Sequence, residues 1–131
     1  MLDVPFFRRP PPALKGETVF LRTPVMNDHA EWAALRDESR GFLVPWEPSW
    51  APDELSRRAF RLRLKRYRAE YENGTGISFF VFDAPTEALA GGITLSNIRR
   101  GVAQTASIGY WMGERYAGRG MMLAALQLLI P

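Results

Sequence analysis

The sequence predicts a single α+β domain whose elements follow the order β-α-α-β-β-β-α. A chain of 131 residues, 47% of them hydrophobic, can bury one core but is too short to expect two. Three strand-like segments with short connections lie in its second half, and this arrangement favours an antiparallel meander. Segments with helical spacing precede and follow the meander, so helices and strands are expected to share one core.

Residues 1–13 are predicted to form an extended, proline-rich arm ahead of the domain, which we place at residues 14–131. The arm carries an acidic residue, Asp3, and has no long apolar run, so it fits neither a signal peptide nor a membrane span. We therefore expect a cytoplasmic protein with no membrane partner.

Two residue counts exclude whole classes of site. The sequence has no cysteine, which rules out disulfides, thiolate metal sites and a cysteine nucleophile. It has one histidine, His29, so a site built from several histidines is impossible, and we expect no metal. His29 has no catalytic partner nearby in the sequence, and we interpret it as a surface residue.

The first half of the domain begins with a predicted strand over residues 18–23, a segment rich in β-branched and aromatic residues. Pro24 ends this strand. Asp28 stands three residues before Glu31, a spacing typical of a capping box, and a short helix is predicted to continue to about Glu38.

Residues 41–50 contain two prolines and two tryptophans. Each proline lacks a backbone donor and restricts the residue before it, so this segment is predicted to be a loop without regular helix. Trp46 and Trp50 are large apolar groups that either anchor the loop or form a wall for a bound peptide.

A long second helix is predicted to begin at Pro52, with Asp53 and Glu54 at the positive end of its dipole, and to end at Asn73 and Gly74. Large side chains recur at helical spacing and predict one core-facing stripe: Phe60, Leu64, Tyr67 and Tyr71. Arginines and a lysine cover the other faces of this helix, which is typical of a solvated helix.

The meander is predicted to consist of strands over residues 77–82, 89–98 and 105–112. In the second strand, alternation places Leu89, Gly91, Ile93 and Leu95 on one face. In the third strand it places Ala106, Ile108, Tyr110 and Met112 on one face. Residues 121–130 are rich in leucine and alanine and predict an apolar helix.

The segment between the last strand and the last helix has the pattern Arg115-x-x-Gly118-x-Gly120. Glycines allow turns that other residues avoid, and they let a ligand approach the backbone closely. The first amides of a helix have no internal acceptor and lie at the positive end of its dipole, an arrangement that suits phosphate. The sequence contains neither a P-loop pattern nor a Rossmann fingerprint, so those two nucleotide-binding classes are disfavoured.

The strand, loop and helix start at residues 108–120 resemble the acetyl-CoA motif of the Gcn5-related N-acetyltransferases (GNAT), whose pattern is Gln/Arg-x-x-Gly-x-Gly/Ala. Residues 14–22, 42–48 and 91–97 extend the resemblance, more narrowly to bacterial ribosomal-protein-alanine N-acetyltransferases. The resemblance implies the acyl-CoA N-acyltransferase (GNAT) fold. Family members continue beyond the motif helix, so residues 14–131 are expected to be the N-terminal portion of a GNAT domain.

The resemblance also implies a site. The strand residues Tyr110, Trp111 and Met112 would offer main-chain groups to the pantetheine arm of acetyl-CoA. The loop would hold the pyrophosphate through Arg115, Tyr116, Ala117, Gly118, Arg119, Gly120 and Met121. The acceptor would be an amine, in the narrower resemblance the N-terminal α-amine of a ribosomal protein. Glu47 is a candidate for the base that deprotonates it.

Other functions remain open at this point. The same scaffold could acetylate a small-molecule amine. The net charge of +3 and the arginine-rich second helix also suit a non-catalytic module that binds RNA or an acidic protein. No nucleic-acid motif is evident, and we expect no DNA partner. A further alternative is a homodimer that pairs an open sheet edge.

Overall fold

The computed structural model describes residues 11, 13–47, 50–96 and 107–130. Its centre is a five-stranded sheet in the order β1-β2-β3-β4-β5, with every neighbouring pair antiparallel. The strands are β1 (Leu14–Lys15), β2 (Val19–Arg22), β3 (Gly76–Asp83), β4 (Leu89–Ser96) and β5 (Ser107–Met112). This confirms the predicted α+β class and the antiparallel meander, and adds the short strand β1, which the sequence analysis did not predict.

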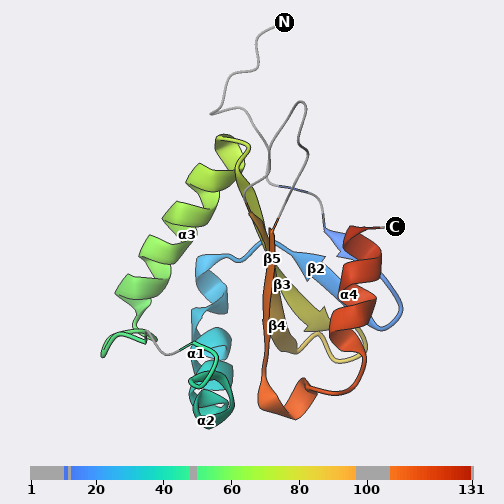
Figure 1. Ribbon diagram of the computed structural model, residues 1–131, viewed down its shortest axis with the longest axis horizontal. Coiled ribbons are helices and arrows are strands. Elements are labelled where there is room, and N and C mark those ends of the chain that lie inside the picture. Colours follow the sequence, from blue (N-terminus) through green and yellow to red (C-terminus); the bar gives the residue numbers. More distant parts are fainter. Residues whose placement is uncertain (1–10, 12, 48–49, 97–106, 131) are drawn as a thin grey trace, which may run out of the picture.

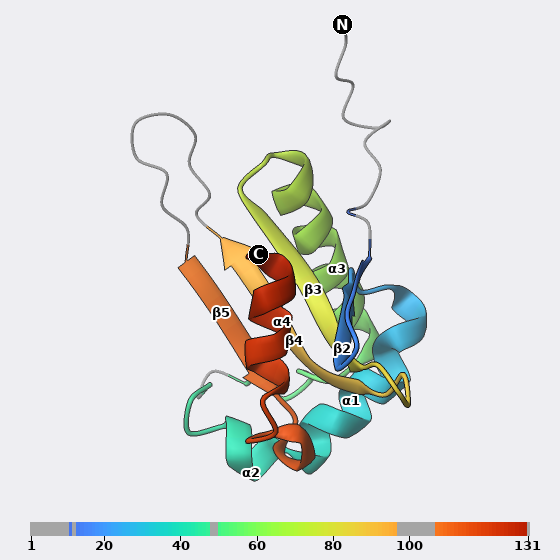
Figure 2. The same ribbon diagram turned by 90° about the vertical axis from the view of Figure 1, so that its right-hand side faces the viewer.

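Helices cover both faces of the sheet (Figures 1 and 2). On one face lie α1 (His29–Glu38), α2 (Arg40–Leu43) and α3 (Arg57–Glu72). On the other face lies α4 (Met121–Leu129), which the short 3-10 helix η3 (Glu114–Tyr116) precedes. A second 3-10 helix, η2 (Met26–Asp28), leads into α1.

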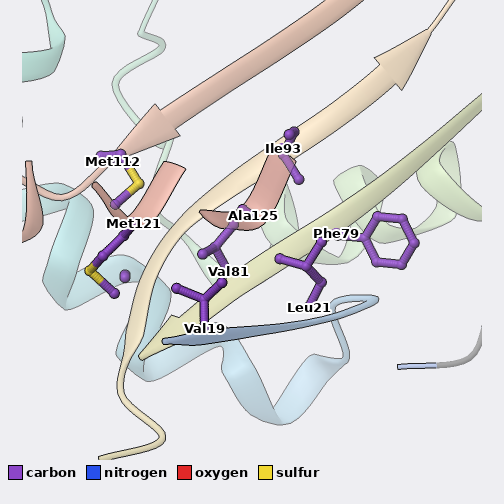
Figure 3. Close-up of a cluster of buried hydrophobic side chains, with 9 residues drawn as sticks. Val19, Leu21, Phe79, Val81, Ile93, Met112, Met121 and Ala125 are labelled. Carbon is purple, nitrogen blue, oxygen red and sulfur yellow. The ribbon is translucent and has the colours of Figure 1, made fainter. Parts of the chain in front are cut away.

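Each face of the sheet has its own hydrophobic core. The core under α4 consists of Val19, Leu21, Phe79, Val81, Ala90, Ile93, Met112, Met121 and Ala125 (Figure 3). The core under α1 and α3 consists of Trp32, Leu35, Phe60, Phe80, Phe82 and Leu89. The alternating residues of β3 divide between these two cores, as the two-residue period of a strand requires.

The predicted face of β4 is wrong at its first residue. Leu89 packs in the core under α1 and α3, whereas Ile93 packs in the core under α4. The register of β3 and β4 shifts between Val81 and Phe82, which pair with Gly91 and Leu89, so that Ala90 is the extra residue. A bulge of this kind reverses the side-chain alternation beyond it.

The predicted capping box of α1 is also wrong. The Asp28 carboxylate instead accepts two hydrogen bonds from Arg22, at 2.9 and 2.7 Å, and one from the Val25 amide. The hydrogen bond to Asp28 is the main cause that raises the pKa of Arg22. The Glu31 carboxylate reaches the sheet instead of the cap, and accepts a hydrogen bond from the Leu89 amide. Both residues were therefore assigned a local role although they make tertiary contacts.

The segment before α3 differs from its prediction at both ends. Residues 40–43, partly within the predicted loop, form the short helix α2, which ends before Pro45. The long helix begins at Arg57, not at Pro52, because the Ser56 hydroxyl caps it by accepting from the Ala59 amide at 3.0 Å. Its predicted end at Asn73 and Gly74 is confirmed, with Gly74 at a φ of 73°.

His29 is not the plain surface residue that was predicted. Its ring is half-buried, and Nε2 lies 2.7 Å from the carbonyl oxygen of Leu55. The predicted arm at residues 1–13 and the strand positions Asn97, Ile98, Thr105 and Ala106 lie wholly or largely outside the described residues. Among the described residues, no helix is both long enough and apolar enough to cross a membrane.

Candidate functional site

The glycines of the loop between β5 and α4 have backbone conformations that explain their presence. Gly118 has a φ of 77°, and Gly120, the residue before the first turn of α4, has a φ of 75°. A Cβ atom added at either position would meet nothing within 4 Å. These positions therefore require glycine for the left-handed backbone and not for lack of space. The open space beside them leaves the loop accessible to a ligand.

Main-chain amides without internal acceptors gather at the same place. Among the described residues, the amides from Gly118 to Leu123 make no hydrogen bond within the chain. The amides of Tyr116 and Ala117, in contrast, donate within the loop to Gly113 and Glu114, at 2.9 and 3.2 Å. The unpaired group lies at the N-terminus of α4, where the helix dipole favours negative charge. Of the predicted loop residues, Gly118, Arg119, Gly120 and Met121 therefore have amides available to an anion.

The arginines of the loop have structural partners. Arg115 donates to both oxygens of Glu38 on α1, at 2.9 and 3.1 Å, and this hydrogen bond is the main cause that raises the pKa of Arg115. The Arg119 guanidinium lies 5.9 Å from the centre of the Tyr116 ring. Arg115 thus braces the loop against α1, while the free amides belong to the residues after it.

Two further residues fix the loop, and the sequence analysis missed both. Ser39 is fully buried, and its hydroxyl accepts a hydrogen bond from the Glu114 amide at 2.9 Å. Gly113 lies against α1, where an added Cβ would stand 2.4 Å from Cδ1 of Leu35. The sequence offered no signal for Ser39, because its partner is 75 residues away.

The strand before the loop presents its predicted residues on different faces. Tyr110 lies opposite Ile93 and is 63% exposed on the face that α4 covers. Trp111 points to the other face, beside the core under α1 and α3. It fits there because Gly92, its partner on β4, has no side chain: an added Cβ would stand 2.4 Å from the indole nitrogen. In the described sheet β5 is an edge strand.

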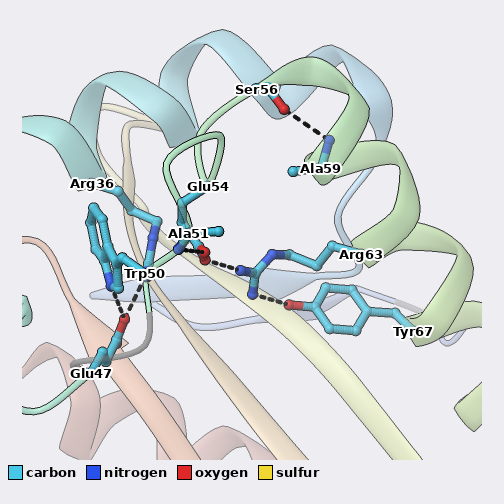
Figure 4. A network of polar contacts seen from close by, with 9 residues as sticks. All are labelled: Arg36, Glu47, Trp50, Ala51, Glu54, Ser56, Ala59, Arg63 and Tyr67. Atoms are coloured by element: carbon cyan, nitrogen blue, oxygen red, sulfur yellow. Dashed lines mark hydrogen bonds and ion pairs between the residues drawn. The ribbon is translucent and has the colours of Figure 1, made fainter.

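Glu47 belongs to a charged and aromatic cluster at one end of α1 (Figure 4). Its Oε1 accepts hydrogen bonds from Arg36 and from the Trp50 indole, at 2.5 and 3.1 Å. The Arg36 guanidinium lies 4.8 Å from the ring centres of both Trp50 and Trp111. Arg36 is 3% exposed, and within the described part of the chain its Nε has no hydrogen-bond partner. This cluster connects the segment around Glu47 to β5.

The two tryptophans that were predicted together have different environments. Trp50 is half-buried against Arg36, so it anchors its segment. Trp46 is 84% exposed and has no such role among the described residues.

A groove of about 380 Å³ lies between α3 and the sheet. Its lining includes Glu47, Arg66, Tyr67, Glu70 and Trp111. Tyr67 is held in place by Arg63, which donates to its hydroxyl at 3.2 Å and pairs with Glu54 at 2.8 Å (Figure 4). The groove reaches β5 on the face of the sheet opposite α4. The edge strand β5 therefore lies between the groove and the face on which the glycine loop leads into α4. Among the described residues, no group of three acidic, cysteine or histidine side chains could hold a metal ion.

The arrangement of strand, amide-rich loop and helix agrees with comparisons to known proteins. Residues 18–131 match the acetyltransferase (GNAT) domain family. The chain belongs to this family. It is 32% identical over 117 residues to the probable N-acetyltransferase YjcK of Bacillus subtilis, covering 89% of this chain and 65% of the relative. It is 28% identical over 126 residues to the [ribosomal protein uS5]-alanine N-acetyltransferase of Escherichia coli, covering 95% of this chain and 65% of the relative.

Among solved structures, Mycobacterium smegmatis RimJ in complex with CoA-disulfide superposes with a TM-score of 0.73 and 26% identity. The match covers 86% of this chain and 54% of that one. The predicted GNAT fold is thereby confirmed. The chain spans 65% of the length of both curated relatives, so the activity of a whole protein is a matter for proposal.

Proposed function

We propose that this GNAT domain binds acetyl-CoA at the loop before α4 and catalyses the transfer of its acetyl group to an amine. The free amides from Gly118 to Leu123 carry the proposal, because several unpaired N–H groups at the N-terminus of one helix can bind a diphosphate. Hydrogen bonds to a charged group contribute roughly 1.5–3 kcal/mol each, whereas an exposed salt bridge contributes about 0–1 kcal/mol. The backbone, more than Arg115 or Arg119, is therefore the expected source of affinity.

The residues fit the cosubstrate along its length. The loop amides suit the pyrophosphate, and the outer edge of β5 at Tyr110 and Met112 offers main-chain groups to the pantetheine arm. The predicted main-chain role of Trp111 does not fit, because the register turns its main-chain groups toward Gly92 on β4. The CoA bound to the RimJ structure supports this assignment by family likeness. An amide of β5 close to the thioester would donate to the oxygen that gains negative charge during transfer.

The acceptor reaches β5 from the groove beneath α3. In the reaction, the amine nitrogen bonds to the acetyl carbon and the carbon–sulfur bond breaks. The sulfur leaves as thiolate, and the proton that the amine gives up ends on this sulfur to form the free thiol. The attacking amine must be neutral. A protein α-amine has a pKa of about 7.7–8.0, compared with about 10.4 for lysine, so an N-terminus needs little help from a base. This favours a polypeptide N-terminus as the acceptor.

Glu47 has a defined position in this proposal. Its Oε1 is engaged by Arg36 and Trp50, while the side chain remains 31% exposed towards the groove. In this proposal its other oxygen orients an incoming amine or a water molecule. Acetylation of a ribosomal protein, in the cytoplasm, is the finer proposal, and the 28% identity to the uS5-alanine enzyme supports it.

The deciding experiment is calorimetric titration of acetyl-CoA into the wild type and Gly120→Trp. The large side chain would occupy the open space beside the amides, so we expect at least a tenfold loss of affinity. Gly74→Trp is the matched control, because Gly74 also has a left-handed backbone, with a φ of 73°, but lies at the turn between α3 and β3. Equal affinity in Gly120→Trp and the wild type would remove the loop from the site.

A second candidate function rests on the surface of α3. Its exposed basic side chains have no ion-pair partner among the described residues: Arg57, Arg58, Arg61, Lys65, Arg66 and Arg68. Such a helix could bind RNA or an acidic protein. Binding of RNA with a steep salt dependence, together with indifference to CoA, would favour this function over acetyl transfer.

A further inference from the structure

The groove beneath α3 is longer than an amine alone requires. A second hollow of about 560 Å³ adjoins the first, and Pro24, Tyr67 and Ser78 line both. Tyr67 therefore stands where the two hollows meet. Its hydroxyl is fixed by Arg63, so this junction has a defined shape.

The floor of the groove crosses the strands instead of following one of them. Gly109, Thr94 and Ser78 lie opposite one another on β5, β4 and β3, and the Ser78 and Thr94 hydroxyls are 3.0 Å apart. Beyond Ser78 the floor continues to Pro24, just after β2. Three steps between neighbouring strands correspond to about 14 Å, which an extended peptide covers with about four residues.

The two hollows differ in chemistry. The hollow that reaches β5 contains the carboxylates of Glu47 and Glu70, which can accept hydrogen bonds from an arriving amine. It also contains the guanidinium groups of Arg66 and of Arg63, which pairs with Glu54. No ion pair of Glu70 occurs among the described residues. The hollow beyond Tyr67 has one carboxylate, Glu72, and one guanidinium, Arg68, and the rest of its lining includes apolar side chains from several elements: Val25, Met26, Leu64 and Ile77.

From the spacing of the two adjoining hollows and the apolar side chains of the second, we infer that the acceptor is an extended polypeptide N-terminus whose fourth or fifth residue is apolar and occupies the hollow beyond Tyr67. This inference rests on the proposed acetyl transfer and names its substrate class. The amine lies at β5, the peptide backbone crosses the polar floor, and an apolar side chain is buried between α3 and the segment after β2. A small amine would leave the second hollow unused.

The first test measures kcat/KM for acetylation of peptides that begin with alanine. The peptides have two, three, five and seven residues, and the two longer ones carry leucine at positions four and five. We expect kcat/KM to rise at least tenfold from three to five residues and to change less than twofold from five to seven. Replacing both leucines by aspartate should remove the gain. A rate that does not depend on length or on these leucines would overturn the inference.

The second test fills the hollow. Val25 lines it and is 48% exposed, so Val25→Trp adds volume without opening a core. We expect this variant to lose the tenfold gain in kcat/KM of the pentapeptide over the tripeptide. Leu62→Trp is the matched control, because Leu62 is 56% exposed on α3 and does not line either hollow of the groove. An equal loss for tripeptide and pentapeptide in Val25→Trp would contradict the inference.

Failure of the proposed function gives a different result. If no amine is acetylated, binding of a fluorescein-labelled heptapeptide with a free N-terminus tests independently of catalysis whether the groove binds a peptide. Weaker binding to Val25→Trp than to the wild type and Leu62→Trp supports the peptide site without catalysis. Equal binding to the three proteins, or binding to none, removes the peptide site.

Discussion

Replacement of Arg36 by methionine would test whether the cluster around Glu47 holds the structure together. Methionine keeps an unbranched stem of similar size but removes the guanidinium that lies 4.8 Å from the rings of Trp50 and Trp111. The variant loses one hydrogen bond to a charged group, about 1.5–3 kcal/mol, and cation–π contacts of about 0.5–2 kcal/mol. It also removes a buried Nε that has no partner among the residues the structure describes, which returns about 1–3 kcal/mol.

The expected net loss is about 2 kcal/mol in the free energy of unfolding. Urea denaturation measures it: with a slope of about 1–3 kcal/mol per molar urea, the midpoint should fall by about 1 M. Arg40→Met is the matched control, because Arg40 also lies 4.8 Å from the Trp50 ring but its side chain is 52% exposed. An exposed pair contributes about 0–1 kcal/mol, so the control should remain within about 1 kcal/mol of the wild type.

A double-mutant cycle with Glu47→Gln isolates the pair. Removing both partners should cost less than the sum of the two single losses, because the groups contact each other directly. Equal midpoints for Arg36→Met and Arg40→Met, or strictly additive losses in the cycle, would refute the view that a buried arginine organises this end of the groove. In that case Glu47 would owe its position to other contacts.

Three further predictions concern glycines and can be measured with the same methods. Gly113→Ala should lower the free energy of unfolding by about 1–3 kcal/mol, since its Cβ would stand 2.4 Å from Leu35. Leu35→Ala should then cost less stability in the Gly113→Ala background than in the wild type, because it removes the clash. Equal costs in the two backgrounds would mean that there is no clash. Gly120→Ala should weaken acetyl-CoA binding about 5- to 30-fold, because a left-handed conformation costs other residues about 1–2 kcal/mol, whereas Gly74→Ala, with the same strain at the turn after α3, should bind like the wild type. Gly118→Asn should bind more tightly than Gly118→Ala, since asparagine tolerates this conformation better, and the reverse order in calorimetry would contradict the backbone argument.

Local sequence signals account for much of the fold. The strands at residues 76–83, 89–96 and 107–112 were predicted within a few positions, because alternation of side chains operates over adjacent residues. The end of α3 at Gly74 and the start of α4 after Gly120 were also predicted, because a left-handed residue at a helix boundary requires glycine almost regardless of its surroundings.

The errors occurred where a local signal competed with a distant partner. Asp28 and Glu31 have the spacing of a capping box, yet they bind Arg22 and the Leu89 amide. The bulge at Ala90 changed the face of Leu89, and alternation alone has no information about an extra residue in a strand.

The sequence by itself determined the chemistry of the loop, since two glycines before an apolar helix predict free amides in left-handed turns wherever that helix lies. Only the tertiary structure decided what braces the loop and what shapes the groove. Arg115 pairs with Glu38 across 77 positions of the chain. Tyr67 lines the same hollow as Ser78 and Pro24 only because α3 packs across the sheet. Contacts of this kind depend on how the whole chain closes on itself, and no spacing of a few residues specifies them.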